Sequence, residues 1–314
     1  MLSWIKRNFL LLFILFLISF WRITFGDWKI PFTDVIRFLF HPDNSAQSIV
    51  INSVRLPRLL CSIASGGLLS VSGVVLQALL ANPLAEPYTL GIASGAAFGA
   101  SIGIMSSTFM IMPMSFAGAI LALILTGLIS LHGGSEKIIL AGVISNAILS
   151  AGVTFLKSIA NDKLGAVVLW LMGSFSGAGI KNILPLYIGV IFVVIPAYVF
   201  APILDAMSLG KNHAAVLGIN ENFMRAALLF TTSIGVSFVV SSFGVIGFVG
   251  LVVPHISRIL IGASHRNLIL HSFFVGASVM SLADGVAQSL GELPVGVLTA
   301  LIGGPFFCWI LSKR

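Results

Sequence analysis

Residues 55–100 read RLPRLLCSIASGGLLSVSGVVLQALLANPLAEPYTLGIASGAAFGA, which is two apolar runs joined by one short polar turn. The runs at 56–80 and 88–108 each supply about the 20 mostly apolar residues that a helix needs to cross a bilayer. Pro83 and Pro87 in the turn between them do not continue a helix, so the chain must stop and re-enter. The stretch predicts a pair of membrane-spanning helices.

The same length criterion, applied to the rest of the chain, predicts ten spanning helices in all. The apolar run after residue 88 is too long for one helix, and we divide it near Pro113. Lys6 and Arg7, followed by an apolar run, resemble a secretory signal. That run ends in bulky residues rather than in a small-residue cleavage site, so we expect it to stay in the membrane. The predicted spans are 9–25, 56–80, 88–108, 110–131, 138–157, 183–204, 226–243, 246–262, 268–289 and 294–312.

The composition agrees with a membrane protein. Of the 314 residues, 58% are hydrophobic and only 9% are charged, whereas a soluble domain carries about 25% charged residues. So few charges exclude a cytosolic enzyme, a disordered protein and a nucleic-acid binder. We therefore expect an all-α polytopic membrane protein that forms one domain over residues 1–314, with no nucleic acid among its partners.

The charges also orient the chain. An even number of spans puts both termini on one side, and the basic residues at the two ends favour the cytoplasm for that side. The remaining basic residues leave an unexpected positive charge outside. The predicted outer set is Arg22, Lys29, Arg37, Arg55, Arg58, Lys157, Lys163 and Lys181.

Four stretches depart from plain apolar helix. Arg55 and Arg58 begin the second span, either as interfacial arginines that extend toward lipid headgroups or as fixed cations aimed at an acidic partner. The turn at 77–87 is polar and rich in proline. The loop at 205–225 can form two short helices across a membrane face, or it is an ordinary surface loop. The stretch at 243–258 has glycine at every third position and then a proline, which indicates either close helix packing or an unwound segment.

Taken in order, these stretches resemble the FecCD family of ABC-importer permeases, which includes permeases for iron siderophores, haem and vitamin B12. The resemblance is carried by residues 55–100, SLGKNHAAVLGI (208–219), GVIGFVGLVVPHISR (244–258), SHRNLI (264–269) and ELPVGVLTALIGGPFFCWIL (292–311). It covers a core at 50–314, while residues 1–45 add a first helix and an outer loop.

The resemblance implies a type II ABC importer permease fold in the cytoplasmic (inner) membrane of a bacterium. The implied partners are a second permease subunit, two ATP-binding subunits and an extracytoplasmic binding protein. Mg-ATP would bind the ATP-binding subunits, because this sequence has no phosphate-binding loop, and we expect no cofactor, metal or catalytic residue in this chain. It is expected to translocate its cargo without being an enzyme.

Site residues follow from the resemblance by position. The implied docking arginines are Arg55 and Arg58, and a third family arginine is replaced by Gln288, which favours a heterodimer in which the other subunit supplies that arginine. The implied cytoplasmic gate is Asn82, Leu84, Ser135 and Glu136. The implied contacts with the ATPase are Ser208, Leu209, Gly210, Lys211, His213, Ala214, Ala215, Leu217 and Gly218.

Two other classes compete with this interpretation. An ion-coupled secondary transporter would need ionisable groups near the middle of the membrane, and Asp284 is the one carboxylate clearly inside a predicted span. A membrane enzyme would need converging catalytic groups, but the six histidines are scattered along the chain. We expect an importer of a ferric siderophore, with haem and a corrinoid such as vitamin B12 as the alternative cargoes.

Overall fold

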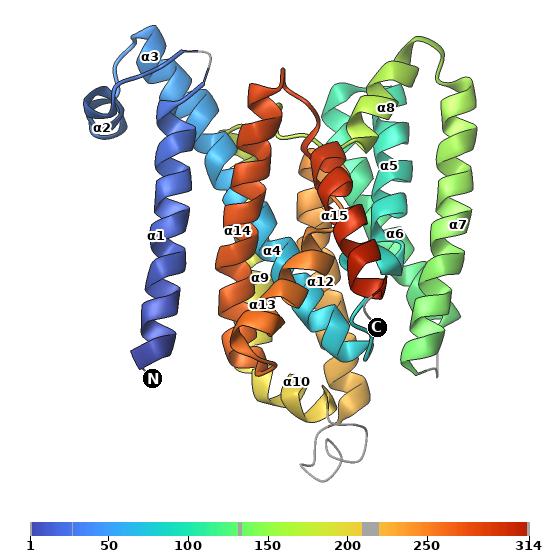
Figure 1. The fold of residues 1–314 in the computed structure, drawn as a ribbon. Helices are drawn as coiled ribbons and strands as arrows, with labels where there is room; N and C mark the ends of the chain where they lie inside the picture. The colour runs from blue at the N-terminus through green and yellow to red at the C-terminus, as the bar shows by residue number, and fades with distance from the viewer. Residues whose placement is uncertain (1, 27, 131–133, 209–219, 313–314) are drawn as a thin grey trace.

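The chain folds as a bundle of helices (Figure 1). The computed structural model describes residues 2–26, 28–130, 134–208 and 220–312, and over these ranges it contains helices and turns but no strand. The α-helices are α1 (Leu2–Thr24), α2 (Phe32–Phe40), α3 (Ala46–Ile49), α4 (Leu56–Leu79), α5 (Ile92–Ser106), α6 (Ile111–Ile129), α7 (Ser135–Ile159), α8 (Leu164–Leu171), α9 (Ile180–Val199), α10 (Ala201–Ser208), α12 (Glu221–Phe243), α13 (Val249–Ile261), α14 (His265–Ser289) and α15 (Val295–Ser312).

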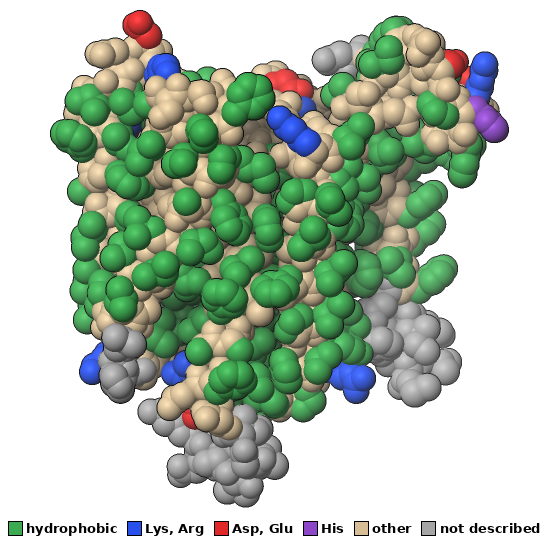
Figure 2. All heavy atoms as spheres, turned by 180° about the vertical axis from the view of Figure 1, so that it is seen from behind, with side chains coloured by type: hydrophobic (Ala, Val, Ile, Leu, Met, Phe, Trp, Pro, Cys, Tyr) green, Lys and Arg blue, Asp and Glu red, His purple; other side chains and the backbone are tan. Residues whose placement is uncertain are grey.

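The bundle has the dimensions and surface of a multi-pass membrane protein. Within the described ranges, six helices are long and apolar enough to cross a bilayer, and four shorter apolar helices accompany them. Figure 2 shows hydrophobic side chains over the broad middle of one face, with charged side chains gathered toward its two ends. The six long apolar helices are Ala46–Leu79, Thr108–Ile129, Ser135–Ile159, Ile180–Val199, Glu221–Phe243 and His265–Ser289. The count of ten spans and the cytoplasmic position of both termini stay predictions.

A helix lies in every predicted span, but several bounds differ from prediction, and two of the differences matter here. The predicted helix at 183–204 breaks at Phe200, because Pro202 has no N–H to continue the ladder, and a new helix, α10, begins at Ala201. The predicted helix at 246–262 starts only at Val249, and residues 244–248 are not helical. Gly244 has a φ of 76°, and a Cβ there would overlap the carbonyl oxygen of Trp170, so both its backbone angle and its surroundings require glycine.

Helix α4 is the centre of the molecule. It contacts α9, α12, α13 and α14, and it is buried along almost its whole length. Small residues allow this enclosure: a Cβ on Gly66 would overlap the backbone of Gly276 in α14, and one on Gly73 would overlap the backbone of Gly250 in α13. Close backbone approach through glycine is how helices gain packing energy where the surrounding solvent is itself apolar.

The other helices flank this centre. Figure 1 shows α1 at one edge, next to α14, and α7 at the opposite edge beyond α5 and α6. Two short helices, α2 and α3, lie at one end of the bundle, and α10 lies at the other end. Short helices α2, α8 and α10 are too brief for a span search, so the sequence did not predict them.

Candidate functional site

Charged side chains meet at the end of the bundle that carries α2 and α3, which the sequence predicts to be outside. Arg58, in the first turn of α4, donates from Nε and Nη2 to the two carboxylate oxygens of Asp284, each at 2.9 Å. Its Nη1 donates to Glu292 at 2.8 and 2.9 Å. The Asp284 pair is bidentate and only 1% of Asp284 is exposed, so this is a strong, shielded contact.

A second arginine completes what we call the outer cluster: Arg22, Arg58, Asp284, Gln288 and Glu292. Arg22 reaches across from α1, forms an ion pair with Asp284, and donates from Nη1 to Oε1 of Gln288 at 2.6 Å. Asp284 therefore lies between two guanidinium groups. The outer cluster ties three helices, α1, α4 and α14, together at one end.

Arg55 lies beside the outer cluster and holds the end of α1. Its guanidinium donates to the carbonyl oxygens of Ile23, at 2.7 Å, and Thr24, at 3.3 Å, and also to that of Trp28. These carbonyls belong to the last turn of α1 and the loop that follows, where helical bonds run out. Arg55 thus donates hydrogen bonds to carbonyl oxygens that the helix itself leaves without a donor.

The predicted docking arginines are buried in this structure. Arg55 is 9% exposed and Arg58 is 5% exposed, so neither is a free interfacial cation. An acidic residue of a binding protein would have to compete with Asp284 and Glu292 for Arg58. Docking by these arginines stays a prediction.

Asp284 was also the residue on which a proton-coupled mechanism would depend. The sequence shows no basic partner near it, yet the structure supplies two from distant helices. Since both of its oxygens already accept bonds from guanidinium groups, Asp284 acts as an anchor between helices.

The predicted gate residues lie at the opposite end of the bundle, which the sequence predicts to be cytoplasmic and which we call the inner end. Oδ1 of Asn82 accepts from the backbone N–H of Leu84 at 2.9 Å, which closes the turn after α4. Ser135, the first residue of α7, donates to the carbonyl oxygen of Leu79 at 3.3 Å and accepts from Arg225 at 3.0 Å. Glu136 is exposed beside it. The structure thus brings three of the four predicted gate positions to one turn, and their approach to a second subunit stays a prediction.

The same turn supports the unwound segment 244–248. The hydroxyl of Tyr88 donates to the carbonyl oxygen of Ile246 at 2.8 Å and accepts from its N–H at 3.1 Å. Oε2 of Glu86 accepts from the N–H of Phe248 at 3.3 Å, at the start of α13. Burial raises the pKa of Glu86, and the bond from Phe248 acts in the opposite direction. Side chains of the turn therefore satisfy backbone groups that a continuous helix would have satisfied itself.

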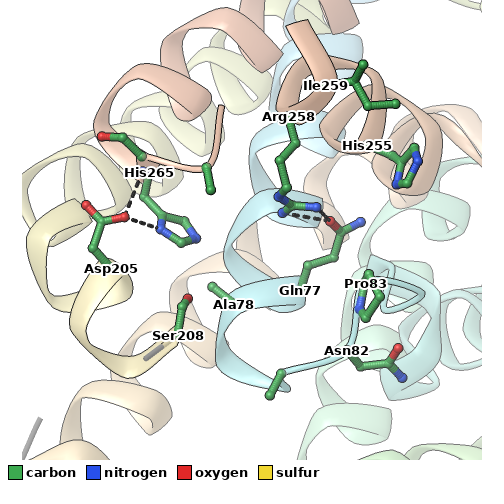
Figure 3. Close-up of a pocket in the computed structure, with 13 residues that line it drawn as sticks. Gln77, Ala78, Asn82, Pro83, Asp205, Ser208, His255, Arg258, Ile259 and His265 are labelled. Atoms are coloured by element: carbon green, nitrogen blue, oxygen red, sulfur yellow. Dashed lines mark hydrogen bonds and ion pairs between the residues drawn. The ribbon is translucent and has the colours of Figure 1, made fainter. Parts of the chain in front are cut away.

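A cavity of about 630 Å³ opens at the inner end between α4, α10, α13 and the start of α14 (Figure 3). On one side, Asp205 of α10 accepts from the N–H of His265 at 2.9 Å and contacts its Nδ1 at 2.6 Å. On another, both terminal nitrogens of Arg258 donate to Oε1 of Gln77 at 3.2 Å. These pairs tie α10 to α14 and α4 to α13.

Among the predicted ATPase contacts, Ser208 lines this cavity at the end of α10. The other predicted contacts lie outside the described residues: Leu209, Gly210, Lys211, His213, Ala214, Ala215, Leu217 and Gly218.

The described part of the chain holds no group of three or more histidine, cysteine or acidic side chains placed to bind a metal ion.

A second hollow, of about 370 Å³, lies along α5 and α7. Asn146, Ser150 and Thr154 line it from α7, at intervals of four residues, and all three are exposed. Ser94 faces them from α5. Residues four apart share one face of a helix, so this is a polar stripe on a helix that is otherwise long and apolar enough to span a membrane.

Two of these features are not evident from the sequence alone. The role of Arg22 depends on partners that lie 262 and 266 residues away in the chain. Glu86 and Tyr88 carry no local signal beyond their place next to a proline-rich turn. The stripe on α7 was visible as a four-residue spacing, and a search for polar periodicity within spans would have found it.

Comparison with known proteins gives one family. The profile of the FecCD transport family matches residues 11–313. A Helicobacter pylori protein named "Probable iron chelatin transport system permease protein" is 37% identical over 281 residues, covering 88% of this chain and 86% of that protein. A Yersinia pestis protein named as a hemin transport system permease is 36% identical, covering 86% and 85%.

A solved structure agrees with these relatives. It is described as an inward-facing conformation of a metal-chelate type ABC transporter, and it is 33% identical with a TM-score of 0.89, covering 98% of this chain and 99% of that one. Other matched relatives are named as permeases for molybdate and vitamin B12.

Proposed function

This chain belongs to the FecCD transport family and is a permease subunit of an ABC importer in the inner membrane; we propose that its cargo is a ferric siderophore or a related iron chelate. The fold is that of a type II ABC importer permease. The subunit would provide a path and leave ATP hydrolysis, with its Mg-ATP, to separate chains.

The observation that carries the translocating role is the polar stripe on α7. The Thr154 hydroxyl donates within α7 to the carbonyl oxygen of Ser150 at 3.0 Å, but the exposed amide of Asn146 is unfavourable against lipid, since it would lose its hydrogen bonds to water. The stripe faces an open hollow rather than a packed neighbour. We propose that a second permease subunit stands opposite this hollow and that the path runs between the two.

The lining of the hollow favours a bulky polar chelate over a small oxyanion. Among the described residues that line it, the polar ones are Ser94, Asn146, Ser150 and Thr154, and none is charged. A small doubly charged oxyanion would find no cation there to replace its water. Neutral hydrogen-bonding groups suit the carbonyl and hydroxyl surface of a chelate, and haem and a corrinoid remain the alternative cargoes.

The predicted partners are proposed with their sites. An extracytoplasmic binding protein would dock over Arg55 and Arg58, the gate would comprise Asn82, Leu84, Ser135 and Glu136, and two ATPase subunits would contact residues 208–218. The second permease subunit is proposed as a partner in a homodimer or a heterodimer, with the heterodimer favoured because Gln288 replaces the third family arginine. Within this chain, Gln288 accepts a hydrogen bond from Arg22.

Uptake in reconstituted vesicles tests the proposal. The importer is purified with its own ATPase and binding protein, and iron-55 ferric siderophore, haem, cyanocobalamin and molybdate are each supplied outside with Mg-ATP inside. We expect ATP-dependent accumulation of the iron chelate. Accumulation of haem or cyanocobalamin alone would replace the proposed cargo, and uptake driven by a proton gradient without ATP would overturn the ATP-driven role.

The ATPase contact has a separate test. Ala215→Asp would place a charge in a contact that excludes water, which is costly unless the charge escapes. We expect the variant to insert in the membrane but to purify without ATPase subunits. Asn220→Asp is the control, because it adds the same charge at an exposed position and keeps a side-chain oxygen that accepts from the N–H of Phe223. Full ATPase content in the Ala215→Asp sample would place the contact elsewhere.

A further inference from the structure

Phe248 has a backbone conformation that its side chain disfavours. Its φ is 69°, in the left-handed region where a bulky residue is an outlier. The turn after α4 contains another such residue, Ala81, with a φ of 48°. Strain of this kind persists only where the surroundings hold it, and it concentrates at sites that change conformation.

Three contacts hold Phe248 and the residues just before it in place. Its N–H donates to the carboxylate of Glu86, which comes from the turn that also contains the predicted gate residues Asn82 and Leu84. Tyr88, two residues further along, binds both backbone groups of Ile246. On the other side, Gly303 of α15 packs so closely that a Cβ there would overlap the Phe248 side chain.

We propose that Glu86 is a positioning residue that holds a hinge at Phe248, and that transport involves release of this hinge. When the gate turn moves, the carboxylate leaves the Phe248 N–H, the residue leaves the left-handed region, and α13 reorients. This inference rests on the proposed function, since it assigns a moving part to the same permease.

Helix α13 connects the hinge at Phe248 to α4. Phe248 immediately precedes α13, and α13 carries Arg258, which binds Gln77 near the end of α4. Gln77 also donates toward the carbonyl oxygen of Leu251, in the first turn of α13, at 3.5 Å. Gln77 of α4 therefore binds α13 both just after the hinge and in its last turn, so a change at the hinge moves groups that α4 holds.

Hydrogen–deuterium exchange on the whole transporter in lipid nanodiscs tests the hinge without reference to cargo. Phe248→Ala and Phe248→Gly both remove the ring, but only glycine adopts a positive φ without steric cost. We expect the amides of residues 247–252 to exchange about tenfold more slowly in the glycine variant than in the alanine variant. Equal exchange in the two variants would overturn the claim that strain is stored at this position.

Glu86 is tested in the same way, with its own conservative control. Glu86→Ala should speed exchange at 247–252 while leaving the amides in the middle of α14 unchanged. Glu86→Gln keeps an oxygen that accepts from Phe248 and should restore the slow exchange. Faster exchange throughout the molecule would mean that Glu86 merely supports the fold, and would contradict a specific role at the hinge.

The final measurement separates the hinge from the choice of cargo. Addition of Mg-ATP to the wild-type transporter should speed exchange at 247–252, and the Phe248→Gly variant should show a smaller change and slower iron-chelate uptake. If the wild type takes up no iron chelate, the proposed cargo fails while the exchange result still decides the hinge. If Mg-ATP leaves exchange at 247–252 unchanged, the hinge is wrong whatever the cargo.

Discussion

The two polar regions of this bundle are built differently. In the outer cluster, guanidinium and carboxylate groups face each other in bidentate and shared ion pairs across α1, α4 and α14. In the interior of the bundle, one length of α13 away from the inner cavity, Glu86 and Tyr88 bind the backbone of residues 244–248 through one and two hydrogen bonds, and Phe248 has a left-handed backbone. Paired charges resist separation, whereas side-chain bonds to a strained backbone segment separate more readily. The contrast indicates a fixed outer cluster and a movable segment at residues 244–248.

The largest effect is expected where the outer cluster loses its shared carboxylate. Asp284→Ala would leave Arg22 and Arg58 buried without it, and breaking a buried pair in this way costs about 3–5 kcal/mol. We expect a much lower yield of folded protein in membranes and a lower melting temperature in nanodiscs. Asp162→Ala, at an exposed site, is the control. A melting temperature equal to that of the wild type would show that the outer end is not held by its charges.

The next largest effect lies in the packing that joins α4 to the movable part. Gly73→Ala would drive a methyl group into the backbone of Gly250, and overpacking of this kind costs about 1–3 kcal/mol. Gly127→Ala is a matched control, because nothing lies within 4 Å of a Cβ built there. Thermal unfolding of the two variants should differ clearly, and similar curves would mean that α4 and α13 separate easily.

Tyr88→Phe should have an effect of the same order as Gly73→Ala, but a local one. The change removes the hydroxyl that satisfies both backbone groups of Ile246, and a buried group left without its partner costs about 1–3 kcal/mol. Hydrogen exchange should quicken at residues 245–248 and stay constant around Asp284. An equal increase in exchange rate at residues 245–248 and around Asp284 would contradict the division into a fixed and a movable region.

Glu292→Ala is expected to have the smallest effect. Although Glu292 is paired with Arg58, its side chain is 46% exposed, and pairs open to solvent contribute about 0.2–1 kcal/mol. The variant should melt close to the wild type. A loss as large as that of Asp284→Ala would mean that the exposed carboxylate, rather than the buried one, holds the outer end.

The helices could be predicted from the sequence because burial in a membrane selects long apolar runs, which are local features. The glycines at 243–258 left an unwound segment as one of two alternatives, and hydropathy could not decide between them, since Val245, Ile246 and Phe248 are as apolar as the helix around them. The break at Phe200 was predictable in principle from Pro202. Arg22 and Asp284 are 262 residues apart, so only the fold reveals that they meet.

The same distance along the chain has a consequence for biosynthesis. Arg58 is made with α4, but its carboxylate partner Asp284 follows 226 residues later. At about 5–20 residues per second of translation, a growing chain would wait about 10–45 s for that partner. During this interval Arg58 lacks its buried partner, and the faces of α4 that later pack against α13 and α14 have no such neighbour, since both helices are made after it. We infer that α4 enters the membrane early and reaches its enclosed position only when α14 is released from the ribosome.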